Sequence, residues 1–229
     1  DLALTQAQEM LKNSAREFLE SECPPSLVRA MEDDERGYPT ELWERMAGLG
    51  WMGLAFPEEY GGEGGTLTDL AVLLEEMGRA MLPGPFFGTV VNGGLTILDG
   101  GSDAQKQQYI PRLASGALIG TAALLEQDGQ YGPDSITLPA NQVTSSLRLS
   151  GSKLFVEHAN TADLMLVPVR PTTYGYSEVT IALIPGALPG VSLAALDSIA
   201  RDRQFEVTFD KVSVASRDIL GVVGQGWPI

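Results

Sequence analysis

Cysteine and histidine are almost missing from this 229-residue sequence, which contains only Cys23 and His158. A single cysteine excludes an intramolecular disulfide framework and any zinc site that needs several cysteines. A single histidine excludes a histidine-rich metal site, so we predict no metal centre, and only one candidate remains for catalysis by a Ser-His-Asp arrangement. Because no serine lies in a G-x-S-x-G motif, hydrolase chemistry of that kind has no support.

Basic residues are scarce as well. The sequence has 15 Lys and Arg against 30 Asp and Glu, which gives a formal net charge of −15. A pI near 4.3 argues against binding to a nucleic-acid backbone or to anionic lipid, both of which require a basic face. No apolar run approaches the roughly 20 residues of a membrane span, and no secretory signal is visible. We therefore predict no nucleic-acid or membrane partner and a cytoplasmic location.

The first half of the chain has the pattern of helices. Thr5 with Gln8, and Ser102 with Gln105, are capping-box pairs that precede apolar residues at helical spacing. Gly50 lies where a glycine commonly follows the last turn of a helix. The spacing predicts five helices: one after Thr5, one from Thr40 to Gly50, one after Ser102, and others over 68–81 and 86–98.

The second half has the pattern of strands. Segments 143–149 and 153–156 flank Ser150-Gly151-Ser152 and predict a β-hairpin. Segment 204–209 alternates between apolar and polar residues, so one of its faces should be buried. Further strands are predicted over 118–125, 164–169 and 179–184. Helices followed by strands, without interleaving, indicate an α+β fold with a helical domain over 1–118 and a β domain over 119–229.

Few single features point to chemistry. The glycine-rich segment 61–65 lacks the Lys-Ser/Thr of a phosphate loop and is interpreted as a connection between helices. His158 is either a hydrogen-bonded surface residue or a neighbour of a bound ligand. Cys23, before Pro24-Pro25, is interpreted as a structural or exposed thiol. Phe86 and Phe87 either line a pocket or start a buried helix.

Several longer segments together resemble the acyl-CoA dehydrogenase family, in order along nearly the whole chain. The segment Leu54-Ala55-Phe56-Pro57-Glu58-Glu59-Tyr60-Gly61-Gly62 resembles that family's "PEEYGG" stretch. Further resemblances follow at Glu75-Glu76-Met77-Gly78-Arg79 ("EELGR"), Gly101 to Gly116 ("GS.EQK..YLP.LASGE"), Leu149-Ser150-Gly151-Ser152-Lys153 ("L.G.K") and Gly224-Gln225-Gly226-Trp227 ("G.GW"). Leu82-Pro83-Gly84-Pro85-Phe86 resembles a bacterial branch with steroid-type and heteromeric members.

The resemblance implies an N-terminal all-α domain, an antiparallel β-barrel-like middle domain and a C-terminal four-helix domain that is absent from this chain. It also implies FAD, an acyl-CoA substrate that is desaturated between Cα and Cβ, a homo- or hetero-oligomer, and an electron-transferring flavoprotein as electron acceptor. The family's glutamate base is expected beyond Ile229, so we predict no catalytic residue here. We expect the chain to be a fragment, or the ordered part of something longer.

The family's two flavin-contact motifs are altered in this sequence. The first aligns with Leu125-Glu126-Gln127, where Leu125 replaces a hydroxyl residue and Gln127 replaces a proline. The second aligns with Phe155-Val156-Glu157, where Phe155 keeps an aromatic ring and Glu157 replaces a small hydroxyl residue. Three interpretations stay open: Glu157 turns to solvent while a backbone N–H contacts the flavin, the subunit has lost its own flavin site, or the chemistry is altered and oxidase-like.

Candidate substrate contacts also come from the resemblance. The acyl chain is expected between the helical and β domains, with Phe86, Phe87, Val90 and Tyr131 as candidate contacts. For the CoA phosphates Arg201 and Arg203 are the candidate basic residues, although exposed ion pairs with Asp202 or Glu206 are the alternative role for these two arginines.

Overall fold

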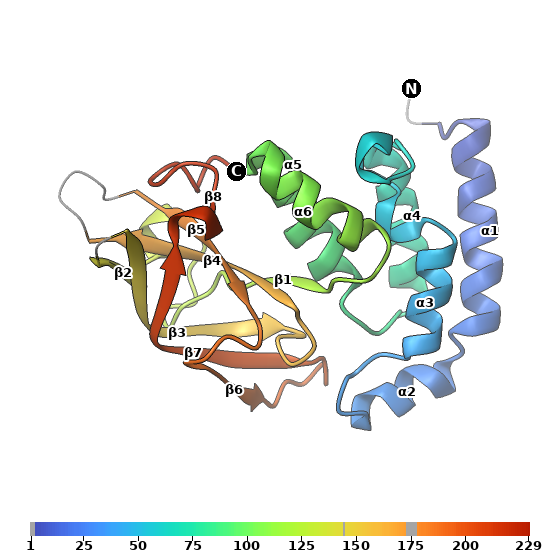
Figure 1. Ribbon diagram of the computed structural model, residues 1–229. Coiled ribbons are helices and arrows are strands. Elements are labelled where there is room, and N and C mark those ends of the chain that lie inside the picture. Colours follow the sequence, from blue (N-terminus) through green and yellow to red (C-terminus); the bar gives the residue numbers. More distant parts are fainter. Residues whose placement is uncertain (1–2, 144, 173–177) are drawn as a thin grey trace.

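A computed structural model places the helices and the strands at opposite ends of the molecule (Figure 1). The structure describes residues 3–143, 145–172 and 178–229. Within these ranges, the α-helices and the π-helix lie before residue 115, and the strands lie after residue 119, with only two short 3-10 helices among them. The α+β architecture predicted from the sequence is therefore confirmed.

Six α-helices and one π-helix make up the first half of the described chain. They are α1 (Gln6–Glu22), α2 (Pro25–Asp33), α3 (Thr40–Gly48), α4 (Leu67–Arg79), the π-helix η3 (Gly88–Leu95), α5 (Thr96–Gly100) and α6 (Asp103–Ala114). Capping boxes at Thr5, Thr66 and Ser102 start α1, α4 and α6, because each cap hydroxyl accepts a hydrogen bond from the backbone N–H three residues later. The predicted helix starts at Thr5 and Ser102 are confirmed.

Two helical features differ from the prediction. Helix α2 was not predicted, although Pro25 at its first position is a recognised start signal. The predicted helix 86–98 is divided into η3 and α5. Glycine permits a close contact in η3, since a Cβ atom on Gly94 would lie 2.2 Å from Cζ of the buried Phe56 ring.

The strands form one mixed sheet. They are β1 (Gly120–Ala122), β2 (Pro139–Val143), β3 (Ser146–Glu157), β4 (Leu164–Pro171), β5 (Thr180–Pro185), β6 (Val191–Leu196), β7 (Gln204–Ala215) and β8 (Ile219–Leu220). Their order is β6-β7-β3-β2-β4-β5-β8, and β1 pairs with β4. Most pairs are antiparallel, whereas β1 and β2 each run parallel to β4.

The predicted hairpin across Ser150-Gly151-Ser152 is wrong. These residues lie inside the twelve-residue strand β3, which pairs along its length with β7. Gly151 has a φ of +145°, and the pairing register shifts between Leu149 and Gly151, so the glycine accommodates a bulge instead of a turn. The hairpin that does form joins β2 to β3, where Val143 is the partner of Ser146.

Buried residues form two core clusters. One joins the helices to one face of β4 and β5 through Leu164, Leu166, Ile181 and Leu183, and the other fills the interior of the strand region. Strands β4 and β5 are therefore buried on both faces, which explains their continuous apolar sequences. The boundary between residues 118 and 119 stays a prediction.

Candidate functional site

The two segments that align with the altered flavin-contact motifs lie next to each other. Leu125 and Leu154 form an antiparallel bridge, in which the N–H of Leu154 donates to the carbonyl of Leu125 at 2.9 Å. Two residues into β1, the Thr121 hydroxyl donates to the carbonyl of Glu157 at 2.7 Å. The fold thus brings residues 121–126 beside the end of β3.

Strand β3 presents its last residues in different directions. A second register shift occurs between Lys153 and Val156, and Phe155 adopts a positive φ of 54°. The Phe155 side chain is 50% exposed, whereas Val156 is fully buried in the strand core. Phe155 can therefore contact a ligand with its ring, whereas Val156 belongs to the core.

Glu157 ends β3 as an exposed residue at the rim of a pocket. Loss of water around its carboxyl raises the pKa of Glu157, and the negative charge of Asp202 raises it further. Glu157 therefore holds a proton more readily than an isolated glutamate does. In its neutral form it can donate a hydrogen bond, as the hydroxyl that it replaces would.

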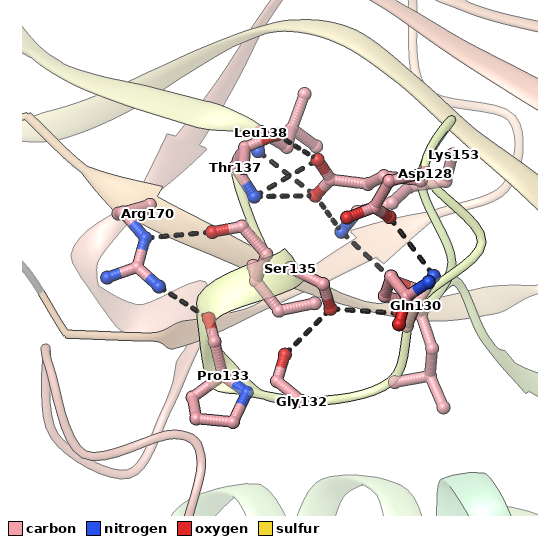
Figure 2. A network of polar contacts seen from close by, with 12 residues as sticks. Asp128, Gln130, Gly132, Pro133, Ser135, Thr137, Leu138, Lys153 and Arg170 are labelled. Carbon is pink, nitrogen blue, oxygen red and sulfur yellow. Dashed lines mark hydrogen bonds and ion pairs between the residues drawn. The ribbon is translucent and has the colours of Figure 1, made fainter.

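Directly behind this surface lies a buried ion pair that sequence reasoning did not predict. Lys153 Nζ lies 2.7 Å from Glu126 Oε1, and the lysine side chain has no exposed surface. Glu126 also accepts hydrogen bonds from the backbone N–H groups of Thr137 and Leu138 and from the Thr137 hydroxyl (Figure 2). Burial alone would raise the pKa of Glu126, but these hydrogen bonds together outweigh it and lower the pKa.

The ion pair fixes the spacing of the two motif segments. Glu126 follows Leu125 and Lys153 precedes Leu154, so the side-chain contact lies beside the backbone bridge. Each residue adjoins an apolar run on one side, Leu124-Leu125 before Glu126 and Leu154-Phe155-Val156 after Lys153, and a buried charge requires a partner of opposite sign. That requirement was the signal that could have paired them.

The loop after Glu126 is held by its own hydrogen bonds. Ser135 Oγ donates to the carbonyls of Gln130 and Gly132, and Arg170 Nε donates to the carbonyl of Ile136 (Figure 2). Gln127 and Tyr131 are exposed on this loop, and Tyr131 is 78% exposed.

The candidate substrate contacts on the helical side separate into two groups. Phe86 and Val90 are buried among the helices, which favours the buried helix start over a pocket wall for these two residues. Phe87, immediately before η3, is 49% exposed. Of the three, only Phe87 presents its ring to the surface.

A pocket of about 470 Å³ lies between the helices and the strands. We call it the seam pocket, and it is lined by residues of α2, the turn 81–84, residues 157–158 and the loop 200–203. His158 follows β3 with a φ of 50°, and its Nδ1 atom is buried without a hydrogen-bond partner. Burial lowers the pKa of His158 to about 4, so the imidazole is neutral at pH 7. The structure thus places the lone histidine at a pocket.

The two candidate arginines contact α2 and the loop after it. Arg201 forms an ion pair with Glu32 at 3.6 Å, and Arg203 donates to the carbonyls of Glu32 and Asp34. The expected ion pairs with Asp202 or Glu206 are therefore replaced by contacts with the helical region. Sequence separation hid these contacts, because about 170 residues lie between the partners.

Within the described ranges, no group of three or more His, Cys, Asp or Glu side chains is placed to hold a metal ion. In the same ranges, each helix is too short or too polar to cross a membrane.

Comparisons with known proteins agree with the order of the motifs. The family described as "Acyl-CoA dehydrogenase, N-terminal domain" matches residues 5–117. The chain is 29% identical to acryloyl-CoA reductase (NADH) of Anaerotignum propionicum, and this match covers 100% of the chain and 59% of the relative. It is 28% identical to the short-chain-specific acyl-CoA dehydrogenase of Clostridium acetobutylicum, and this match covers 100% of the chain and 62% of the relative. The chain thus spans about three fifths of these relatives.

The fold agrees with solved structures as well. The structure of the Tcur3481-Tcur3483 steroid ACAD superimposes with a TM-score of 0.86 at 28% identity, covering 100% of this chain and 60% of that one. The fold is therefore shared over the full length of the chain. The chain belongs to the acyl-CoA dehydrogenase family.

Proposed function

We propose that the complete protein carrying this chain catalyses FAD-dependent α,β-dehydrogenation of an acyl-CoA thioester, and that this chain supplies its first two domains. The observation that carries the proposal is the juxtaposition of Leu125 with Leu154 and of Thr121 with Glu157. It joins both segments that align with flavin-contact motifs into one surface.

This surface fits the flavin of FAD in its apolar part. Leu124 is 39% exposed, and with the half-exposed Phe155 it offers apolar area for the ring system. The hydrogen-bonding part of the surface differs from the family pattern, because the side chain of Leu125 has no hydrogen-bond donor. Burial and the charge of Asp202 raise the pKa of Glu157, so this carboxyl is protonated more readily than an isolated glutamate would be. FAD, when bound, would supply the acceptor for the hydride that leaves Cβ.

The residues of this chain act by positioning. Thr121 holds the backbone of Glu157, the Glu126–Lys153 pair holds the two segments together, and Phe155 covers the ring. On the helical side, Phe87 is the proposed contact of the acyl group. The base that removes the α-proton is proposed to lie outside this chain, so residues 1–229 alone are expected to be inactive.

The visible spectrum of the full-length protein tests this function. We expect flavin absorption that bleaches when an acyl-CoA is added without an electron acceptor. The Phe155→Ala variant should lose flavin, whereas Phe87→Ala, which removes an equally exposed aromatic ring from the helical side, should retain it. A colourless but correctly folded full-length protein would contradict the proposal.

A second candidate is a flavin-deficient, non-catalytic subunit of a heteromeric complex. It is favoured by the absence of a side-chain hydroxyl at both Leu125 and Glu157, and by the structural similarity to the Tcur3481-Tcur3483 complex. Co-expression with candidate partner chains and analysis of the purified assembly separate the two functions. A homo-oligomer that carries flavin without a partner would exclude the second candidate.

The remaining partners follow from the family. We propose an electron-transferring flavoprotein as electron acceptor, a homo- or hetero-oligomer, and a cytoplasmic location. Reduction of a purified electron-transferring flavoprotein during turnover would test the first of these.

A further inference from the structure

The seam pocket adjoins the surface proposed for the flavin. Glu157 belongs to both, because it ends β3 and also lines the pocket. Pockets of about 300–1,000 Å³ hold ligands of drug size, and the seam pocket, at about 470 Å³, falls within this range. It is therefore large enough for an acyl group bulkier than a short straight chain.

One wall of the seam pocket is apolar. Val28 and Met31 from α2 and Leu82 and Pro83 from the turn contribute to it, and all four are half-buried. Met81 continues this wall with a side chain that is 62% exposed. Such a wall packs against hydrocarbon and offers no hydrogen bond or opposite charge to a charged group.

The remaining lining residues form a polar wall, in which both arginines already have partners. Arg201 faces the Glu32 carboxylate at 3.6 Å, and Arg203 donates to the carbonyls of Glu32 and Asp34. The Nε atom of Arg203 is buried without a partner and has no exposed surface, so a ligand in the pocket cannot reach it. The charge of Arg201 is partly balanced by Glu32.

The negative charges of that wall are less well compensated. Asp202 accepts hydrogen bonds from Ser198 and Gln204, which are both neutral, and it lies close enough to Glu157 for the two carboxyls to interact. With Glu32 the wall has three carboxyls against two arginines, and His158 is neutral. A further carboxylate in this pocket would meet net repulsion.

The backbone around the pocket is unusual. Five non-glycine residues of the described chain have a positive φ, and three of them, Met81, His158 and Arg201, line the seam pocket. This conformation is costly for residues other than glycine and is concentrated at ligand sites. The three residues belong to three different segments, so the strain surrounds the pocket from several sides.

We propose that the seam pocket accepts the far end of the acyl group, beyond the part that contacts Phe87, and selects bulky, uncharged acyl groups over those that end in a carboxylate. This inference rests on the proposed function, and it adds the substrate class. The apolar wall packs against the hydrocarbon part. Asp202 and Glu157 reject a terminal anion.

Three CoA thioesters test the proposal on the full-length protein: octanoyl-CoA, octanedioyl-CoA, which has the same chain length with a terminal carboxylate, and 3-cyclohexylpropanoyl-CoA. Binding is measured by calorimetry and turnover by kcat/KM. We expect octanoyl-CoA and 3-cyclohexylpropanoyl-CoA to bind at least tenfold more tightly than octanedioyl-CoA. Equal or tighter binding of octanedioyl-CoA overturns the proposal.

Two variants connect the preference to the pocket. Asp202→Asn should reduce the discrimination against octanedioyl-CoA at least threefold, whereas Asp210→Asn, an exposed aspartate that does not line the pocket, should leave it unchanged. Met31→Trp should fill the pocket and weaken the binding of 3-cyclohexylpropanoyl-CoA more than the binding of butyryl-CoA. The proposal is overturned if Asp202→Asn and Asp210→Asn change the discrimination against octanedioyl-CoA equally. It is also overturned if Met31→Trp weakens the binding of 3-cyclohexylpropanoyl-CoA and butyryl-CoA equally.

The two proposals fail in different ways. If the thioesters bind with the expected order but no turnover or flavin is found, the dehydrogenase function fails and the substrate class stands. If turnover is found without discrimination between octanoyl-CoA and octanedioyl-CoA, the substrate class fails and the function stands.

Discussion

Replacing Lys153 with methionine should destabilise the fold strongly, because it removes one partner of a buried ion pair. The lysine side chain is fully buried, and its Nζ lies 2.7 Å from Glu126. Removing one partner of such a pair typically costs about 3–5 kcal/mol, because the remaining charge stays in a poorly solvated site. Glu126 keeps its hydrogen bonds from Thr137 and Leu138, which places our expectation for Lys153→Met at the lower end, about 3 kcal/mol.

The assay is urea unfolding followed by circular dichroism. The matched control is Lys12→Met, which breaks an ion pair of similar N–O distance, 2.9 Å, with the exposed Glu75. Exposed pairs contribute about 0.2–1 kcal/mol, so the control should change the free energy of unfolding by no more than this. If Lys153→Met costs no more than Lys12→Met, the reasoning about burial is refuted.

A double-mutant cycle with Glu126→Gln isolates the pair itself. The two single variants should be non-additive by more than 1 kcal/mol, because contacting buried groups are coupled by about 0.5–3 kcal/mol. The pH dependence gives a second measurement. Since the folded-state pKa of Glu126 is lowered, its stabilisation is complete above its ordinary pKa near 4.5 and is lost as the pH falls through the folded value. Glu126→Gln should remove this acid-side loss.

Three further predictions concern the hydrogen bonds and close contacts around the site. Because burial lowers the pKa of His158 to about 4, the unfolded chain binds a proton below pH 6.5 that the folded chain does not bind; stability should therefore fall between about pH 6.5 and 4, and His158→Gln should flatten that part of the unfolding profile. Thr121→Val should cost about 1 kcal/mol and weaken flavin retention, whereas Thr121→Ser should restore both, because only serine can still donate to the Glu157 carbonyl; equal behaviour of the two variants in unfolding and flavin titrations would contradict this. Gly94→Ala should lower the free energy of unfolding by about 1–3 kcal/mol through overpacking against Phe56, and an unchanged urea midpoint would show that the ring can move aside.

Local signals in the sequence predicted the helical half well. Capping boxes at Thr5 and Ser102 depend on residues three positions apart, so the sequence alone contains the interaction. The π-helix was predicted only as a helix. Gly94 in this helix packs closely against Phe56, 38 residues earlier in the chain, and periodicity cannot reveal such a contact.

The strand half shows where local reasoning failed. Ser150-Gly151-Ser152 has the composition of a turn, yet β7 pairs on both sides of it and keeps β3 continuous. A turn and a bulge both favour glycine, and only the position of the partner strand distinguishes them. The exposed Phe87 and the buried Phe86 are a second example, since adjacent aromatic residues give no sign of which one faces the core.

The sequence by itself determined the classes of function that are excluded, the order of helices before strands, and the motifs that identify the family. These properties depend on composition, spacing and short segments. Only the tertiary structure decided that Lys153 neutralises Glu126, that Glu157 and His158 border a pocket, and that the arginines of the 200–203 loop contact α2 and the residue after it. Each of these contacts joins residues far apart in the chain, and their energies depend on burial and distance, which exist only once the chain has folded.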